Sequence, residues 1–258
     1  MHIDRDALFP FLIYNNPVKY SENIKLYPIT MSDIITFQLL SKSITVRKNS
    51  IFREKEIIKM PYLDFLIYCL YHKNIEKEYQ IDGLSQYYIY AIQLLQLCCK
   101  DAKIKLNEHS HSLSINDEII TPEKFDDLRR IIIIQNDIDF DIDEFLNYDT
   151  EQNLLKAQKK LNKGNSANIE DYIDSLIIAM NTDEKRIMGL TIRKFWRYIK
   201  RFQLYENYSI LKTGECSGFV SFKEPVKYWM VSLEDTDKYD NLKTDENSLK
   251  GKISNANN

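Results

Sequence analysis

Glycine, long apolar runs and an excess of one charge are all scarce in this sequence. Only 6 of its 258 residues are glycine, and no apolar run approaches the roughly 18 residues that a membrane-spanning helix needs. With 35 Lys and Arg against 38 Asp and Glu, the formal net charge is only -3. The low glycine content and the long periodic stretches favour a mainly helical protein. The charge balance excludes a global electrostatic attraction to nucleic acid or to an anionic membrane.

Cysteine and the short catalytic motifs are also scarce. The 4 cysteines include a vicinal pair at Cys98 and Cys99, suggest no disulfide framework, and indicate a reducing cytoplasm. The sequence has no phosphate-binding GxxxxGK[ST], no dinucleotide-binding GxGxxG and no GxSxG nucleophile elbow. The apolar patch near the N-terminus is short and follows acids, unlike a secretory signal. We therefore expect structural cysteines, no catalytic residue, no cofactor and a protein that is not an enzyme.

The alternating acids Asp137, Asp139, Asp141 and Asp143 are the strongest candidate for a metal site. An EF-hand loop that starts at Asp137 needs Gly at its sixth position and Glu at its twelfth, where this chain has Ile142 and Tyr148. A solvated acidic edge is the favoured interpretation, with a weak cation site or a contact with a basic partner as alternatives. His109 and His111 lack the companions of a zinc set and are expected on the surface of a hairpin. No metal is predicted.

Periodicity and turn signals predict a mainly α protein with a small β-hairpin element, an α+β fold. Residues 83–100 form the most hydrophobic helical pattern and are expected at the centre of the N-terminal core. A hairpin is predicted around Asn116 and Asp117. A helix follows from Thr121, Pro122 and Glu123 to about Gln135.

Composition shifts predict five parts, with two helical modules joined by a polar linker. Pro10, Pro17 and Pro28 indicate an extended arm rather than a helix at the N-terminus. The polar segment LNKGNSAN has no apolar period and is typical of a linker. The predicted parts are an extended arm at 1–30, a helical domain with the hairpin at 31–160, the linker at 161–168, a helical and aromatic module at 169–234, and a flexible polar tail at 235–258.

The stretch from Thr191 to Trp229 contains both tryptophans and a dense mixture of aromatic and basic residues. Read as a helix, its first part places Ile192, Phe195, Trp196 and Ile199 on one apolar stripe. Five cations fall largely elsewhere and predict a basic outer face: Arg193, Lys194, Arg197, Lys200 and Arg201. A second aromatic cluster follows, interrupted by Gly214 and Gly218, which allow the chain to turn back.

Several ordered patches of the sequence resemble a family of bacteriophage tail assembly chaperones from phages that infect Gram-positive bacteria. The patches are TIRKFW at 191–196, SGFVSFKEPVKYW at 217–229, LYPITMSD at 26–33 and RKNSIFREKEIIKMPYLDFL at 47–66. The resemblance implies tail morphogenesis in the host bacterial cytoplasm, where the protein holds a tape-measure or tail-tube protein during assembly. None of these patches is a catalytic signature.

We expect exposed apolar and aromatic surface on the C-terminal module to bind the partner. A structural component of the virion tail or baseplate is one alternative. A nucleic-acid-binding module that uses the basic helix 191–201 is another, disfavoured by the acidic balance and the lack of a recognition motif. Homo-oligomerisation stays open, and no membrane contact is expected. The candidate partner-binding residues are Arg193, Phe195, Trp196, Arg197, Phe219, Phe222 and Trp229.

Overall fold

The computed structural model describes residues 3–72, 74–79, 81–107, 112–143, 148–150, 168–218, 222 and 225–233. It divides into two compact units. Unit 1 comprises Met1–Glu151 and Met180–Trp196, and unit 2 comprises Gln152–Ala179 and Arg197–Asn258. Several predictions lie outside the described residues and stay predictions: the hairpin histidines, the linker at 161–167, Phe219 and the tail at 235–258.

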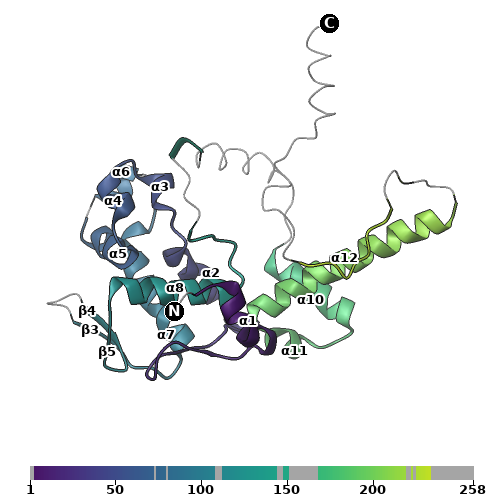
Figure 1. Ribbon diagram of the computed structural model, residues 1–258, viewed down its shortest axis with the longest axis horizontal. Coiled ribbons are helices and arrows are strands. Elements are labelled where there is room, and N and C mark those ends of the chain that lie inside the picture. The colour runs from purple at the N-terminus through teal and green to yellow at the C-terminus, as the bar shows by residue number, and fades with distance from the viewer. Residues whose placement is uncertain are drawn as a thin grey trace, which may run out of the picture. The chain divides into compact units, whose positions relative to one another are not determined.

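Helices make up most of the residues that the structure describes (Figure 1), so the predicted mainly α class with a small β element is confirmed. In unit 1 the helices are α1 (Arg5–Tyr14), α2 (Ile34–Ser41), α3 (Lys48–Ile51), α4 (Lys55–Lys59), α5 (Tyr62–Tyr71), α6 (Ile75–Tyr79), α7 (Tyr87–Cys99), α8 (Pro122–Gln135) and α11 (Glu184–Met188). Short 3-10 turns are η1 (Met31–Asp33), η2 (Lys42–Ile44) and η3 (Leu84–Gln86). Two helices run through the boundary between the units: α10 (Ile169–Met180) and α12 (Ile192–Cys216).

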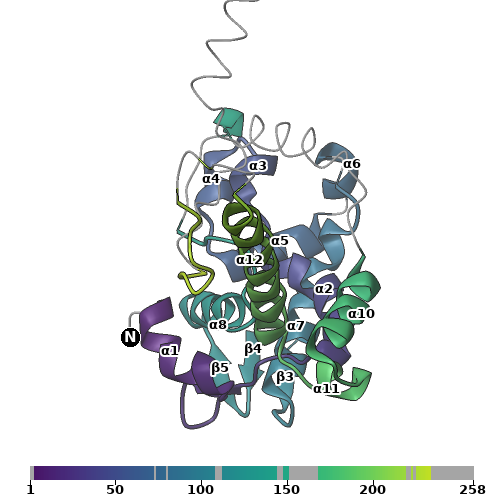
Figure 2. The same ribbon diagram turned by 90° about the vertical axis from the view of Figure 1, so that its right-hand side faces the viewer.

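The core of unit 1 forms where α5 packs against α7 and α8 (Figure 2). Phe65 of α5, Leu94 of α7 and Leu128 of α8 are all fully buried. Full burial of one such side chain stabilises a fold by about 1.5–3 kcal/mol. The predicted central position of the 83–100 helix is confirmed, since α7 buries Tyr88, Ala91, Leu94, Leu95, Cys98 and Cys99.

Two small antiparallel sheets complete unit 1. One pairs β1 (Val18–Lys19) with β2 (Lys25–Leu26), and the other has the order β3-β4-β5, from Ile104–Asn107, Ser112–Ile115 and Glu118–Ile120. Asn116 and Asp117 join β4 to β5 with φ values of 49° and 65°. Two successive positive φ values are typical of the two-residue hairpin turn that matches strand twist. The hairpin predicted at this position is confirmed.

The extended arm predicted at residues 1–30 is wrong for residues 5–14, which form α1. Asp4 caps this helix by accepting a hydrogen bond from Ala7 N at 2.7 Å. Leu8 and Leu12 are buried, on a helix that contacts α8, whereas Pro10 is exposed. A proline inside a helix removes one backbone donor. The cap and the buried leucines offset that loss, which reading the prolines alone could not show.

The N-terminal segment of unit 1 is joined to the segment that leads into α12. Met31 N donates to Leu190 O at 2.8 Å, and Ile192 N donates to Ile29 O at 2.9 Å. Thr30 and Thr191 form an antiparallel bridge between these bonds. The sequence patches at 26–33 and 191–196 are therefore paired structural segments of one unit.

Candidate partner-binding surface

The aromatic and basic stretch of the sequence folds into one long helix and a returning segment. α12 runs 25 residues, from Ile192 to Cys216. Gly214 lies inside it, so the expectation that Gly214 turns the chain back is wrong. Gly218, with φ of 75°, follows the helix end and adopts the left-handed conformation that glycine tolerates best.

The first turns of α12 belong to the interior of unit 1. Phe195 is fully buried, with its ring in an edge-to-face contact with Trp196 at 5.2 Å between centroids. Arg193 is 3% exposed, and its guanidinium donates to Leu12 O at 3.3 Å. The prediction that Arg193 lies on a basic outer face is therefore wrong. Because both side chains are buried, Arg193 and Phe195 are unsuited to direct partner contact, whereas Trp196 and Arg197 are half-buried.

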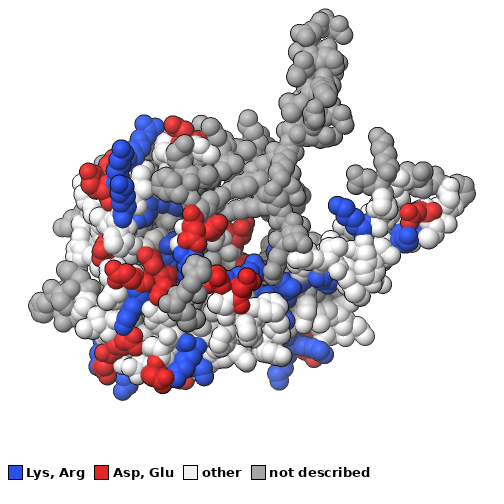
Figure 3. All heavy atoms as spheres, viewed as in Figure 1, with Lys and Arg blue, Asp and Glu red and all other residues white. Residues whose placement is uncertain are grey.

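The distal part of α12, residues 200–216, is different. None of the described residues of α12 after Ile199 is buried. Large apolar side chains are exposed along it, including Tyr205 at 48%, Ile210 at 66% and Leu211 at 42%. Figure 3 shows mostly uncharged atoms along this helix, with few charged groups. A helix that exposes this much apolar surface is typical of an interaction site.

The C-terminal strap, defined here as residue 222 and residues 225–233, lies along the distal part of α12 (Figure 1). Trp229 makes an edge-to-face contact with Tyr205, and Tyr228 makes another with Tyr208, each at 5.4 Å between centroids. Near the helix end, the ring of Phe222 packs over Gly214, where its Cζ is 3.8 Å from the point that a Cβ would occupy. The strap thus runs antiparallel to the helix and adds aromatic area to it.

Arg201 fastens the strap to the helix. Its guanidinium donates to Trp229 O at 2.7 Å and to Val231 O at 3.0 Å. The same guanidinium lies 5.9 Å from the centre of the Trp229 ring. Strap side chains stay exposed outside these contacts: Tyr228 at 52%, Met230 at 60% and Val231 at 43%. The helix and strap together present a fixed backbone with an apolar outer surface.

These contacts reduce the basic face that the sequence predicts on this helix. Arg193 is bound inside unit 1, and Arg201 is bound to the strap. Phosphate binding needs cations that are free to replace counterions. Because Arg193 and Arg201 are engaged in structural contacts, the 191–201 helix is a weaker nucleic-acid site than its composition indicates.

The acidic series makes contacts with arginines instead of a metal cluster. Asp137 binds Arg5 at 3.0 Å, and Asp143 binds Arg130 through both carboxylate oxygens at 2.6 and 2.7 Å. In the part of the chain that the structure describes, no group of three His, Cys, Asp or Glu side chains could hold a metal ion. Within the same residues, no helix is both long enough and apolar enough to cross a membrane.

The cysteines are free thiols, of which Cys69, Cys98 and Cys99 are buried in unit 1 and Cys216 is exposed in unit 2. Burial raises the pKa of Cys69 and of Cys99 to about 12. Burial likewise raises the pKa of Cys98 well above its usual value. Because the thiolate is the reactive form, these three groups are inert at neutral pH.

Sequence reasoning found the aromatic residues of this surface but missed the geometry. It grouped aromatic and basic residues of one stretch of the sequence, so it placed Phe195 and Trp229 in one candidate set although they belong to different units. It also missed the role of Arg201, whose acceptors are backbone carbonyls 28 and 30 residues away. The one usable signal was Gly218, which marks where the chain reverses.

Comparison with known families gives one match. Residues 157–234 match a family model described as the YomV second domain, which suggests a phage-associated protein family. The match covers residues 157–179 and 197–234 of unit 2, together with residues 180–196 of unit 1. No curated protein and no solved structure matches the chain.

Proposed function

We propose that this phage-associated chain is a non-enzymatic tail assembly chaperone that binds an apolar segment of a tape-measure or tail-tube protein. The observation that supports the proposal is the surface of the distal part of α12 and the C-terminal strap. Apolar and aromatic side chains remain exposed on it although the backbone is held in place by Arg201. Such a protein works in the host cytoplasm while the tail is built.

The dimensions of this surface suit a helical segment of the partner. Residues 200–216 of α12 extend about 25 Å at 1.5 Å per residue. An amphipathic helix of about four to five turns covers the same length and buries anchors at every third or fourth position. The family that this chain resembles acts on tape-measure proteins, which are long coiled coils. Aromatic residues such as Tyr205 and Tyr228 are the kind that dominate binding energy at interfaces.

Co-expression of the chain with the tape-measure protein of the same phage tests the proposal. We expect the two proteins to copurify. The double substitution Ile210→Asp and Leu211→Asp is expected to weaken binding about tenfold or more, because both side chains are exposed and their replacement removes apolar contact with the partner. The matched control changes Gln203→Asp and Asn207→Asp, two exposed polar residues on the same helix. Equal affinity of both variants, or no copurification, would contradict the proposal.

Purified virions distinguish a chaperone from a structural component. A chaperone leaves before the particle is complete, so mass spectrometry is expected to recover little of this chain from virions. Recovery in amounts similar to those of tail proteins would assign it to the tail or baseplate instead. A gel shift with labelled DNA at low salt tests the nucleic-acid alternative, for which we expect no complex.

A further inference from the structure

Two cavities that share lining residues lie in unit 1 beside α3 and α4. The larger has a volume of about 540 Å³ and is lined by Asn49, Phe52, Arg53, Lys55, Ile58, Lys59, Tyr148 and Asp149. The smaller, of about 170 Å³, shares Asn49 and Ile58 with it and reaches Arg47, Lys48, Tyr62, Arg129 and Phe140. The two form one cleft, which we name the α3–α4 cleft.

The lining of this cleft is strongly cationic in a chain whose net charge is only -3. The larger cavity contributes Arg53, Lys55 and Lys59 against Asp149. The smaller contributes Arg47, Lys48 and Arg129 against Asp141. Figure 3 shows a row of Lys and Arg side chains over α4 and its neighbours. Cations gathered along a cleft raise the local concentration of anionic ligands.

The floor of the larger cavity is apolar and aromatic. Phe52 is fully buried beneath it, with its ring 4.5 Å from that of Tyr79 and 5.6 Å from that of Phe65. At the rim, the guanidinium of Arg53 lies over the Tyr148 ring at 4.5 Å. A ligand for this cavity therefore combines negative charge with an apolar or aromatic group.

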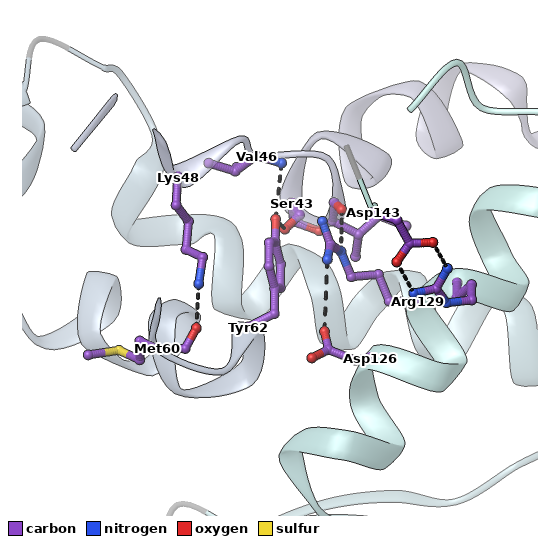
Figure 4. Close-up of polar contacts among 10 residues, drawn as sticks. Ser43, Val46, Lys48, Met60, Tyr62, Asp126, Arg129 and Asp143 are labelled. Atoms are coloured by element: carbon purple, nitrogen blue, oxygen red, sulfur yellow. Dashed lines mark hydrogen bonds and ion pairs between the residues drawn. The ribbon is translucent and has the colours of Figure 1, made fainter. Parts of the chain in front are cut away.

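A polar network fixes one wall of the smaller cavity (Figure 4). Tyr62 donates to Ser43 O at 2.8 Å and accepts from Val46 N at 3.0 Å. Arg129 donates to Ile44 O at 2.6 Å, and its guanidinium stacks 3.6 Å from the centre of the Tyr62 ring. On the other side of Tyr62, Lys48 donates to Met60 O. The cations of the wall are positioned before any ligand arrives, which lowers the entropic cost of binding.

A segment of this chain already shows the chemistry that the cleft accepts. Residues 137–143 alternate aspartate with apolar residues. The ring of Phe140 lies near two guanidinium groups, 4.7 Å from that of Arg47 and 5.3 Å from that of Arg129. Asp143 pairs with Arg130 through both oxygens. The smaller cavity is thus bordered by an acidic segment whose aromatic ring lies against two arginines.

We infer that the larger cavity of the α3–α4 cleft binds an acidic peptide segment of a protein partner, with one apolar or aromatic side chain inside the cavity. The carboxylates of the peptide pair with Arg53, Lys55 and Lys59, which are exposed at the rim. The recognition repeats, in trans, what residues 137–143 do beside the smaller cavity. Each exposed pair contributes modestly, so three pairs and the apolar anchor act together.

Fluorescence anisotropy with a labelled peptide of the sequence of residues 136–145, NDIDFDIDEF, tests the inference on the full chain. We expect saturable binding that weakens with added salt. The charge reversals Arg53→Glu, Lys55→Glu and Lys59→Glu together are expected to weaken it about tenfold or more. A peptide in which serine replaces Ile and Phe is expected to bind about tenfold more weakly, and Tyr148→Ala is expected to reduce affinity several-fold.

The control reverses three exposed lysines of unit 1 outside the cleft: Lys42→Glu, Lys103→Glu and Lys185→Glu. It changes the net charge equally, and its affinity for the peptide is expected within about twofold of that of the unmodified chain, because screened charges beyond a Debye length contribute little. An equal loss in the control, or no binding at about 1 mM peptide, overturns the inference. Tighter binding of an oligo-dT strand that displaces the peptide also overturns it, in favour of nucleic acid. A failure here leaves the surface on α12 unaffected, since that surface is tested with different variants and a different partner.

Discussion

Among the residues that the structure describes, unit 1 buries many more side chains than unit 2 does. Unit 1 buries several aromatic residues, among them Phe52, Phe65 and Phe125. In unit 2, Leu176 and Ile199 are the only buried residues among those that the structure describes. Both units contain many large apolar side chains. Their different exposure therefore reflects packing partners within the chain rather than composition.

This difference shows where stability and where binding reside. A side chain that is already buried can stabilise the fold but has no further apolar area to offer a partner. A side chain held at the surface, such as Ile210, keeps that area available. Unit 1 is expected to set the free energy of unfolding, whereas unit 2 is expected to set affinity at the surface proposed on the distal part of α12.

Thiol chemistry offers the largest contrast between the units. With Ellman's reagent at pH 8, we expect Cys216 to react at once and Cys69, Cys98 and Cys99 to react only when unit 1 opens. If opening costs about 4 kcal/mol, the difference in rate is about a thousandfold. The reaction time course separates one fast thiol from three slow ones. In strong denaturant all 4 cysteines react together, and rapid reaction of all of them in the native chain would contradict the contrast.

Truncation of core and surface residues gives the next largest effect. Phe65→Ala is expected to lower the free energy of unfolding by about 3–5 kcal/mol, because it leaves a cavity at a fully buried site. Ile210→Ala removes an exposed side chain and is expected to change stability by less than about 0.5 kcal/mol. Urea denaturation followed by circular dichroism measures both. Similar losses for the two variants would mean that the distal part of α12 is packed after all.

Alkaline pH tests the buried tyrosine of the cleft wall. Burial raises the pKa of Tyr62 to about 12 from its usual value of 10.0. Below pH 10 the phenol is neutral in both states, so its contribution to stability is complete. Between pH 10 and 12 only the unfolded state ionises, and stability falls by up to about 2–3 kcal/mol. Denaturation curves measured at several pH values in this range give the free energy of unfolding. This free energy is expected to fall less steeply with pH for Tyr62→Phe, which cannot ionise. An unchanged slope would place the sensitivity elsewhere in unit 1.

Release of the strap is the smallest of these effects in energy. Arg201→Ala removes two hydrogen bonds to strap carbonyls, each worth about 1 kcal/mol net. In a Trp196→Phe background, Trp229 becomes the single tryptophan, and its emission is expected to shift to longer wavelength when the strap detaches. The unfolding of unit 1 is expected to stay unchanged. Gln203→Ala, on the same helix and exposed, serves as the control, and an identical shift there would exclude Arg201 as the fastener.

The helices with strong local signals were predictable from the sequence. Thr121 and Pro122 signalled the start of α8, and the structure confirms that Thr121 accepts a hydrogen bond from Lys124 N. The pair Asn116 and Asp117 signalled the hairpin, since few other residues tolerate its two positive φ values. In both places a few neighbouring residues determine the structure.

The contacts between distant segments were not predictable. α1 was missed because the exposed Pro10 outweighed an N-cap and two buried leucines. Arg193 was placed outside because helical spacing alone cannot show that the carbonyl of Leu12, 181 residues earlier, covers it. Tyr62 and Arg129 carried no motif, and their stacking follows from how α5 meets α8. Periodicity identifies apolar faces, but only tertiary structure shows which of them find a partner within the chain.

The bridge between Thr30 and Thr191 also bears on how the chain folds as it is made. Ser32 bonds to the carbonyl of Met188, 156 residues later. At a synthesis rate of about 5–20 residues per second, the ribosome takes roughly 8–30 seconds to deliver that partner. Throughout this interval the backbone groups of Ile29 and Met31 lack the acceptors and donors that they have in the finished fold. Unit 1 is therefore closed only when translation is well advanced, and the distal part of α12 emerges directly afterwards.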